Sequence, residues 1–372
     1  MKKILKLFVA FSMAFGLAAC GSSSDDSKEA DIRVAMITDS GDITDQSFNQ
    51  TTYEAGKAFC EENDLEFNYY KPASDDDSAR IAMVDKAVDD GYNVILMPGY
   101  LFAEAAAYGT NTYPDVKFIA LDLSEYDLQG ASEEANMDAL YSTVYQEEIP
   151  GYMAGYAAVK MGYTELGFLG GMAVPAVIRY GYGYVQGADA AAKELNTQIN
   201  IKYVYGGQFY GDADITAKMD TWYSQGTQVV FACGGGIYTS AAEAANKVNG
   251  KLIGVDSDQA PIIDGTYAEG MTITSAMKGL ANTVTTLLQA IVDGEFDSYA
   301  GKVDNLGLVS ENPAENYVGL SDSTQWCDTF TEDDYKALTA KIYNGEIKVS
   351  NDTENEPTVS EFTTVDYQGS IK

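Results

Sequence analysis

Short apolar runs alternate with amphipathic segments along the first part of the chain. The apolar runs have the length of β-strands and lie at 33–38, 93–97 and 116–121, and a further strand is predicted at 66–70. The segments between them have the period of a helix and lie at 47–62, 75–90 and 101–112. Continuous apolar strands joined by helices are typical of a parallel sheet that is covered on both faces. The pattern therefore predicts a doubly wound α/β lobe.

The same alternation restarts after residue 145. Strands are predicted at 165–170, 201–205, 228–232, 251–255 and 272–276. Helices are predicted at 146–160, 175–195, 214–225, 240–249, 280–293 and 332–343. A chain of 372 residues is long enough for two such units. We therefore predict two successive doubly wound lobes.

The amino terminus has a different pattern. A basic start precedes an apolar run at 5–19, and Leu17-Ala18-Ala19 is followed by Cys20. Small residues before a cysteine resemble the lipobox of bacterial lipoproteins. We predict a signal peptide at 1–19, lipidation of Cys20, a tether at 20–30, and anchoring to the outer face of a bacterial cytoplasmic membrane. The alternative is an ordinary secretory signal with an incidental cysteine.

Charge narrows the range of functions. Lys and Arg total 23 against 56 Asp and Glu, and His is absent, so the formal net charge is −33. This charge repels phosphates and therefore argues against nucleic acid binding. The absence of His removes the commonest general base and metal ligand. Cys60, Cys233 and Cys327 have no metal-ligand spacing, and buried inert thiols are expected at Cys60 and Cys233. We predict no metal, no cofactor and no enzymatic activity.

Candidate binding residues follow the predicted strands. In open α/β sheets, ligands bind where the carboxyl ends of the strands meet, and carboxylates there accept hydrogen bonds from hydroxyl groups. Aromatic faces stack on flat rings, whereas the glycine spacing after the first strand does not fit a dinucleotide site. The residues selected on this basis are Asp39, Phe48, Asn49, Asp122, Met172, Phe209, Gly235, Asp256 and Lys278. Together they suit a neutral polar ring compound.

Two alternatives remain at this stage. Asp39 and Asp45 could simply cap helices while Phe48 is a core residue. Asp256 and Asp258 could instead form a carboxylate pair that acts on a glycosidic bond, although Asp258 could equally cap the next helix.

Several motifs together resemble the basic membrane protein family of lipoproteins. The motifs are Thr38-Asp39-Ser40-Gly41, Asp45-Gln46-Ser47-Phe48-Asn49-Gln50, Gly167-Phe168-Leu169-Gly170-Gly171-Met172, Ile253-Gly254-Val255-Asp256-Ser257-Asp258-Gln259 and Thr274-Ser275-Ala276-Met277-Lys278. The resemblance implies a type I periplasmic-binding-protein fold, with two doubly wound lobes joined by a hinge of several crossovers. On this basis the N-terminal lobe comprises 31–145 and 276–302, and the C-terminal lobe comprises 146–275 and 303–372.

The resemblance also implies a function. Nucleoside-binding members of the family are substrate-binding proteins of ABC transporters, so the expected partners are a nucleoside of the adenosine, guanosine and inosine class and an ABC permease, with the protein a monomer. Phe48 matches one of the two rings that enclose the base, and Phe209 matches the other by its position in a variable loop. Asp256 and Lys278 match the ribose contacts, and Asp39 and Asn49 match polar positions on the side of the base or of the ribose. The alternative ligand is a sugar or a signalling furanose.

The chain departs from the family pattern at two places. The helix that begins after Tyr145 lacks the usual compact Glu-Gly pair, and the loop 206–212 is rich in Tyr and Gly. Both departures bear on the preference for a base.

Overall fold

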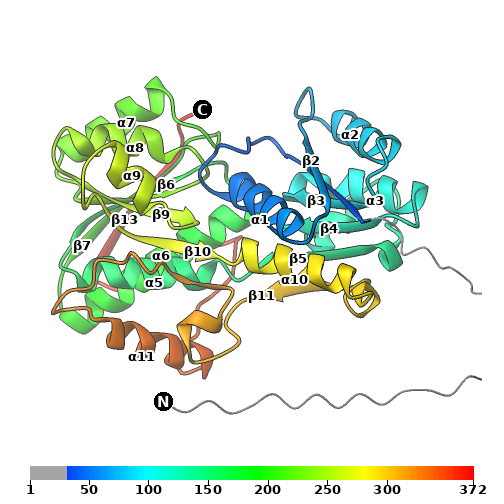
Figure 1. Cartoon of the computed structure of the whole chain (residues 1–372). Coiled ribbons are helices and arrows are strands. Elements are labelled where there is room, and N and C mark those ends of the chain that lie inside the picture. Colours follow the sequence, from blue (N-terminus) through cyan, green and yellow to red (C-terminus); the bar gives the residue numbers. More distant parts are fainter. Residues whose placement is uncertain (1–31) are drawn as a thin grey trace, which may run out of the picture. The chain divides into compact units, whose positions relative to one another are not determined.

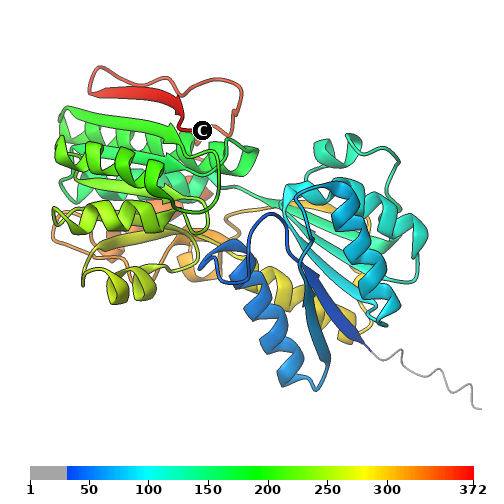
Figure 2. The same ribbon diagram turned by 90° about the horizontal axis from the view of Figure 1, so that it is seen from above.

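Two β-sheets organise the protein in this computed structural model, which describes residues 32–372. In both views the blue-to-cyan part of the chain and the green part form separate lobes (Figure 1 and Figure 2). The predictions for 1–19, Cys20 and 20–30 lie outside the described residues. Residues 32–372 contain no helix that is long and apolar enough to cross a membrane.

The first sheet has the strand order β11-β5-β4-β3-β1-β2, and every neighbouring pair is parallel. Its strands are β1 (Arg33–Ile37), β2 (Glu66–Tyr70), β3 (Val94–Pro98), β4 (Lys117–Leu121), β5 (Leu140–Tyr145) and β11 (Val303–Leu306). The helices of this lobe are α1 (Phe48–Glu62), α2 (Asp77–Asp89), α3 (Ala103–Thr112), α4 (Glu125–Gln129) and α10 (Leu280–Val292). Helices α1 and α10 pack together, as do α2 and α3. The sheet is therefore covered on both faces, as predicted.

The second sheet has the order β12-β10-β9-β8-β6-β7-β13. Its strands are β6 (Glu165–Gly170), β7 (Ile199–Tyr205), β8 (Val229–Cys233), β9 (Lys251–Asp256), β10 (Thr272–Lys278), β12 (Val318–Leu320) and β13 (Thr363–Ser370). Only β12 runs antiparallel to its neighbour. The helices are α5 (Glu148–Lys160), α6 (Pro175–Leu195), α7 (Ala213–Ser224), α8 (Tyr238–Asn246), α9 (Ala260–Thr266) and α11 (Glu332–Tyr343).

Structural neighbours and pairing confirm the α/β class and the two-lobed type I arrangement, but strand pairing corrects two lobe boundaries. We expected the N-terminal lobe to resume at 276 and to end at 302. Strand β10 instead pairs with β9 as far as Met277, so it belongs to the second sheet. Strand β11 pairs with β5, so 303–306 belong to the first. The chain therefore crosses between lobes after β5, after β10 and after β11.

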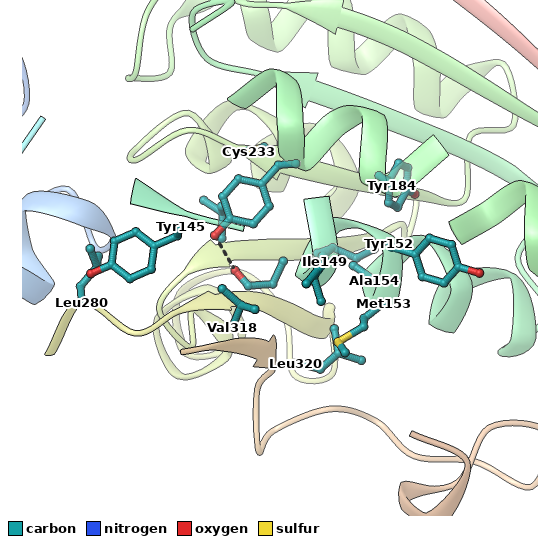
Figure 3. Packing of buried hydrophobic residues seen from close by; sticks show 14 of the residues in the cluster. Tyr145, Ile149, Tyr152, Met153, Ala154, Tyr184, Cys233, Leu280, Val318 and Leu320 are labelled. Atoms are coloured by element: carbon teal, nitrogen blue, oxygen red, sulfur yellow. Dashed lines mark hydrogen bonds between the residues drawn. The ribbon is translucent and has the colours of Figure 1, made fainter. Parts of the chain in front are cut away.

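Helices α5 and α6 cover one face of the second sheet and approach each other closely. A Cβ added to Gly155 would lie 2.1 Å from the carbonyl oxygen of Tyr184, and one added to Gly187 would lie 1.9 Å from that of Tyr152. Only glycine fits at such a distance. Ile149 and Met153 of α5 lie with residues of β12 in one buried cluster (Figure 3). This packing fixes the segment at which the chain enters the second lobe.

The sequence pattern missed several elements. Strand β5 follows a polar interval and was not predicted, and neither was the short helix α9. The region after residue 350 contributes β13, which adds to the open edge of β7 and appears in red at the edge of the lobe in Figure 2. Cys60 and Cys233 are buried free thiols as predicted, while Cys327 is half-buried and also free. Burial raises the pKa of Cys60 to about 12.

Candidate functional site: a cleft between two sheets

A cavity of about 740 Å³ lies between the carboxyl ends of the two sheets. All the residues selected from the sequence line it, namely Asp39, Phe48, Asn49, Asp122, Met172, Phe209, Gly235, Asp256 and Lys278. The two lobes contribute to opposite walls, because each sheet turns its strand ends toward the other. The topology therefore brings together residues that are far apart in the chain.

Lys278 is the central cation of the cavity. Its side chain is 2% exposed, and its Nζ lies 2.7 Å from Asp122 Oδ2, 2.9 Å from Glu147 Oε1 and 3.9 Å from Asp256 Oδ1. The ring centroid of Phe48 lies 5.1 Å from the same Nζ. Burial alone would lower the pKa of Lys278, but the surrounding carboxylates raise it well above its usual value. The ammonium therefore stays charged.

Asp122 and Asp256 occupy equivalent positions in the two lobes. They end or directly follow β4 and β9, which are the third strands from corresponding edges of the two sheets. Both have left-handed backbone conformations, with φ of 60° and 62°. Such conformations are costly for residues other than glycine and cluster at functional sites. Burial raises the pKa of Asp122 to about 6, against the opposing effect of Lys278.

Asp256 accepts hydrogen bonds from both lobes. Ser47 Oγ of the first lobe donates to Asp256 Oδ2 at 2.7 Å, and Tyr180 OH of the second donates to Oδ1 at 3.2 Å. The Nζ of Lys278 lies 3.9 Å from Asp256 Oδ1, and it has shorter contacts with Asp122 and Glu147.

Glu147 is an important residue that the sequence analysis missed. It is fully buried just after β5, and its Oε2 accepts a 2.6 Å hydrogen bond from Arg179 Nε of α6. Burial would raise the pKa of Glu147, but the charges of Arg179 and Lys278 hold it below its usual value. Its neighbour Glu148 has a pKa raised to about 7 by burial. In the sequence, Glu147 was marked only by the departure from the family pattern near the start of α5.

At the other end of the cavity, Asp39 and Asn49 lie side by side. Asp39 Oδ1 accepts from the backbone N–H of Gly41 at 2.7 Å and from Asn49 Nδ2 at 3.0 Å. Burial raises the pKa of Asp39 to about 6. Asp45 accepts backbone N–H bonds from Ser47, Asn49 and Gln50, so it does cap the start of α1. Asp39, by contrast, accepts no backbone N–H bond from α1, since its partners are Gly41 of the loop and the side chain of Asn49, and it lines the cavity.

Phe209 rests on two glycines. A Cβ at Gly171 would lie 2.4 Å from the ring, and one at Gly234, where φ is +158°, would lie 3.1 Å from it. The ring occupies this place because neither glycine has a side chain. Gln208 Nε2 donates to Asp212 Oδ2 at 2.9 Å and closes the loop that holds Phe209. Gly171 and Gly234, which follow β6 and β8, are therefore needed to seat the ring of this loop.

Asp258 does not share the site. Its Oδ1 accepts from the backbone N–H of Ala260 at 3.2 Å and from Ser323 Oγ at 2.6 Å, and it does not line the cavity. The capping alternative is therefore the one the geometry supports.

Within residues 32–372 no cluster of His, Cys, Asp and Glu could hold a metal ion.

Solved structures share this two-lobed fold. A solute-binding protein of an ABC transporter system from Aeropyrum pernix K1 has a TM-score of 0.65 at 22% identity, covering 87% of this chain and 88% of that chain. One from Conexibacter woesei has a TM-score of 0.65 at 20% identity, covering 86% and 99%. At these identities the likeness shows the fold alone, which is that of solute-binding proteins.

A family model gives the particular family. The model described as "ABC transporter substrate-binding protein PnrA-like" matches residues 32–353. The chain therefore belongs to this family of ABC transporter substrate-binding proteins, which also confirms the resemblance seen in the motifs. The family consists of solute-binding proteins and not enzymes, as predicted.

Curated relatives match over most of their length. The "ABC transporter nucleoside-binding protein BmpA" of Lactococcus lactis subsp. cremoris is 25% identical over 319 residues, which is 80% of this chain and 87% of the relative. The "CD4+ T-cell-stimulating antigen" of Listeria monocytogenes is 29% identical over 380 residues, or 94% and 98%. "Basic membrane protein A" of Borreliella burgdorferi is 28% identical over 362 residues, or 95% and 97%.

Proposed function

We propose that this substrate-binding protein captures nucleosides between its lobes and delivers them to an ABC permease, acting as a lipid-anchored monomer outside the cell. Purine nucleosides are the first candidates. The observation that carries the proposal is one cavity that combines two aromatic rings with a cluster of carboxylates around a buried ammonium. The Lactococcus relative named for nucleoside binding supports it.

Each part of a nucleoside has a matching part of the cavity. The rings of Phe48 and Phe209 offer faces for a planar base, since stacking tolerates any base. Asp256 and Lys278 offer an acceptor and a donor for vicinal ribose hydroxyls. Asp39 and Asn49 offer polar atoms for the edge of the base. A free sugar would use the charged cluster but has no planar base to stack on the two rings.

Replacement of the stacking ring tests this assignment. Phe48→Ala should weaken nucleoside binding by roughly tenfold or more, because a base stacked on an aromatic ring contributes on the order of 1 to 3 kcal/mol. Calorimetric titration with adenosine measures the effect.

Phe67→Ala is the matched control, because Phe67 is a half-buried ring of the same lobe that packs on Tyr53 and does not line the cavity. It should bind adenosine as the wild type does. Equal affinity of the wild type for free ribose and adenosine would favour the sugar alternative.

The anchor is tested separately. An "Uncharacterized lipoprotein" of Pyrococcus abyssi, 25% identical over 315 residues, covers 82% of this chain and supports anchoring. Cys20→Ala in the full chain should move the protein from the membrane fraction to the soluble fraction without changing adenosine affinity, because Cys20 carries the lipid. Fractionation and labelling with a radioactive fatty acid measure this. A variant that remains in the membrane fraction would refute lipidation at Cys20.

A further inference from the structure

Two segments beside the cavity are hydrogen-bonded across the lobes. Residues Gln46 and Ser47 precede α1 in the first lobe, whereas Asp256, Ser257 and Gln259 end or follow β9 in the second. Ser47 Oγ donates to Asp256 Oδ2 at 2.7 Å. Ser257 Oγ and Gln259 Nε2 both donate to the backbone carbonyl of Gln46, at 2.9 and 3.0 Å. We call these five residues the latch.

Burial and backbone conformation distinguish the latch from an incidental surface contact. Ser47 and Gln259 are fully buried, so their polar groups need the partners they have. Gln46 adopts a left-handed conformation with φ of 57°, which is unfavourable for a residue other than glycine. Hydrogen bonds hold Gln46 in this conformation from both lobes. The backbone N–H of Gln46 donates to Gln50 Oε1 at 3.0 Å, and the carbonyl of Gln46 accepts from Ser257 and Gln259 of the other lobe. The second lobe thus helps to hold the loop in a costly shape.

The latch ends on a carboxylate that lines the cavity. Asp256 receives one hydrogen bond from its own lobe, through Tyr180, and one from the other lobe, through Ser47. The Tyr180 bond persists however the lobes move, whereas the Ser47 bond exists only while they are together. Both hydrogen bonds to the carboxylate are therefore present together only while the lobes keep the arrangement seen in this structure.

We infer that the latch couples closure of the lobes to ligand retention, with Ser47 as a positioning residue that holds Asp256 toward the ligand. This inference rests on the proposed function only for the identity of the ligand. A ligand that binds Asp256 favours the closed arrangement, and by linkage the latch slows release of that ligand. Residues of the latch other than Asp256 need not touch the ligand.

The test removes latch hydrogen bonds one at a time. Ser257→Ala removes only the hydroxyl that bonds to Gln46, and Ser47→Ala removes the bond to Asp256. Each should weaken adenosine binding by about tenfold, mainly through a faster dissociation rate with little change in association. Stopped-flow fluorescence and calorimetry measure these quantities. A merely structural role would lower the melting temperature and leave the dissociation rate unchanged.

Two further variants serve as controls. Ser224→Ala removes a hydroxyl of the same lobe that bonds only within α7, to Thr221, and should behave as the wild type. Ser257→Thr keeps the hydroxyl and should restore the slow dissociation. Small-angle X-ray scattering without added ligand should give a larger radius of gyration for Ser47→Ala and Ser257→Ala than for the wild type, because open arrangements become more populated.

The scattering result separates this inference from the proposed function. If the wild type binds no adenosine but both variants have the larger radius, the latch stands and the proposed ligand is wrong. If both variants have the radius of the wild type, the latch is refuted, whatever their affinity for adenosine.

Discussion

Asp256→Ala should lose about 2 to 5 kcal/mol of nucleoside affinity and should discriminate less strongly than the wild type against a 2′,3′-dideoxynucleoside. The Asp256 side chain is only 10% exposed at the cavity wall. In the variant, few water molecules could therefore take the place of the carboxylate as acceptors for the ribose hydroxyls. Each oxygen keeps acceptor capacity for a ligand, because Ser47 and Tyr180 donate one hydrogen bond to each of them and Asp256 lines the cavity. Calorimetric titration of adenosine and 2′,3′-dideoxyadenosine into both proteins gives the two differences.

The neighbouring Asp258 provides the matched control. Asp258→Ala removes a carboxylate two positions along the chain that bonds to the start of α9 and to Ser323, outside the cavity. It should lower the melting temperature slightly while binding both ligands as the wild type does. If Asp256→Ala instead keeps full discrimination between the two nucleosides, Asp256 is not a ribose contact, whatever its effect on stability.

Lys278→Met should be destabilising by about 3 to 5 kcal/mol, because removal of one partner of a buried charge cluster leaves the others uncompensated. Asp122 and Glu147 both lie within 3 Å of the ammonium, and Glu147 is fully buried. Among residues 32–372, Arg179 would remain as the only cation in contact with Glu147, and no cation would remain in contact with Asp122. Urea denaturation at neutral pH measures the loss of unfolding free energy.

The loss should depend on pH in a definite direction. The pKa of Asp122 is already raised by burial to about 6 in the folded protein, above its ordinary value of 3.8, so its contribution to stability is present at low pH and is lost as pH rises through about 6. Removing Lys278 takes away a charge that lowers this pKa, so protonation of Asp122 extends to higher pH. The deficit of Lys278→Met should therefore be larger at about pH 7.5 than at about pH 4.5.

An exposed lysine gives the comparison for this series. Lys86→Met removes a surface ion pair with Asp90, in which the lysine side chain is 55% exposed, and should change stability by less than about 1 kcal/mol. A deficit of Lys278→Met that is equally small, or that does not vary with pH, would mean that the carboxylates find other partners. Either result would contradict the role of Lys278 as the charge that balances the cleft.

The sequence by itself determined the alternating order of strands and helices and the edge at which binding residues gather. A short apolar run such as that of β3, which a turn-forming Pro-Gly follows, favours a buried strand, and parallel strands all turn their carboxyl ends to the same edge. For this reason residues as distant in sequence as Asp39 and Lys278 could be assigned to one cavity, which they do line together. The cap formed by Asp45 follows equally from local sequence, since its partners lie within five positions.

Only the tertiary structure decided which strands pair and which charges meet. Strand β11 joins the first sheet because the edge of β5 was open to it, and nothing in its own four residues specifies that edge. Glu147 contacts Arg179 and Lys278 because α6 and the end of β10 both pack near the start of α5. Glu147 and Lys278 are more than a hundred residues apart in the chain. The same holds for Ser47 and Asp256. Local sequence fixes the residues available at a strand end, whereas long-range packing fixes which of them come within hydrogen-bonding distance.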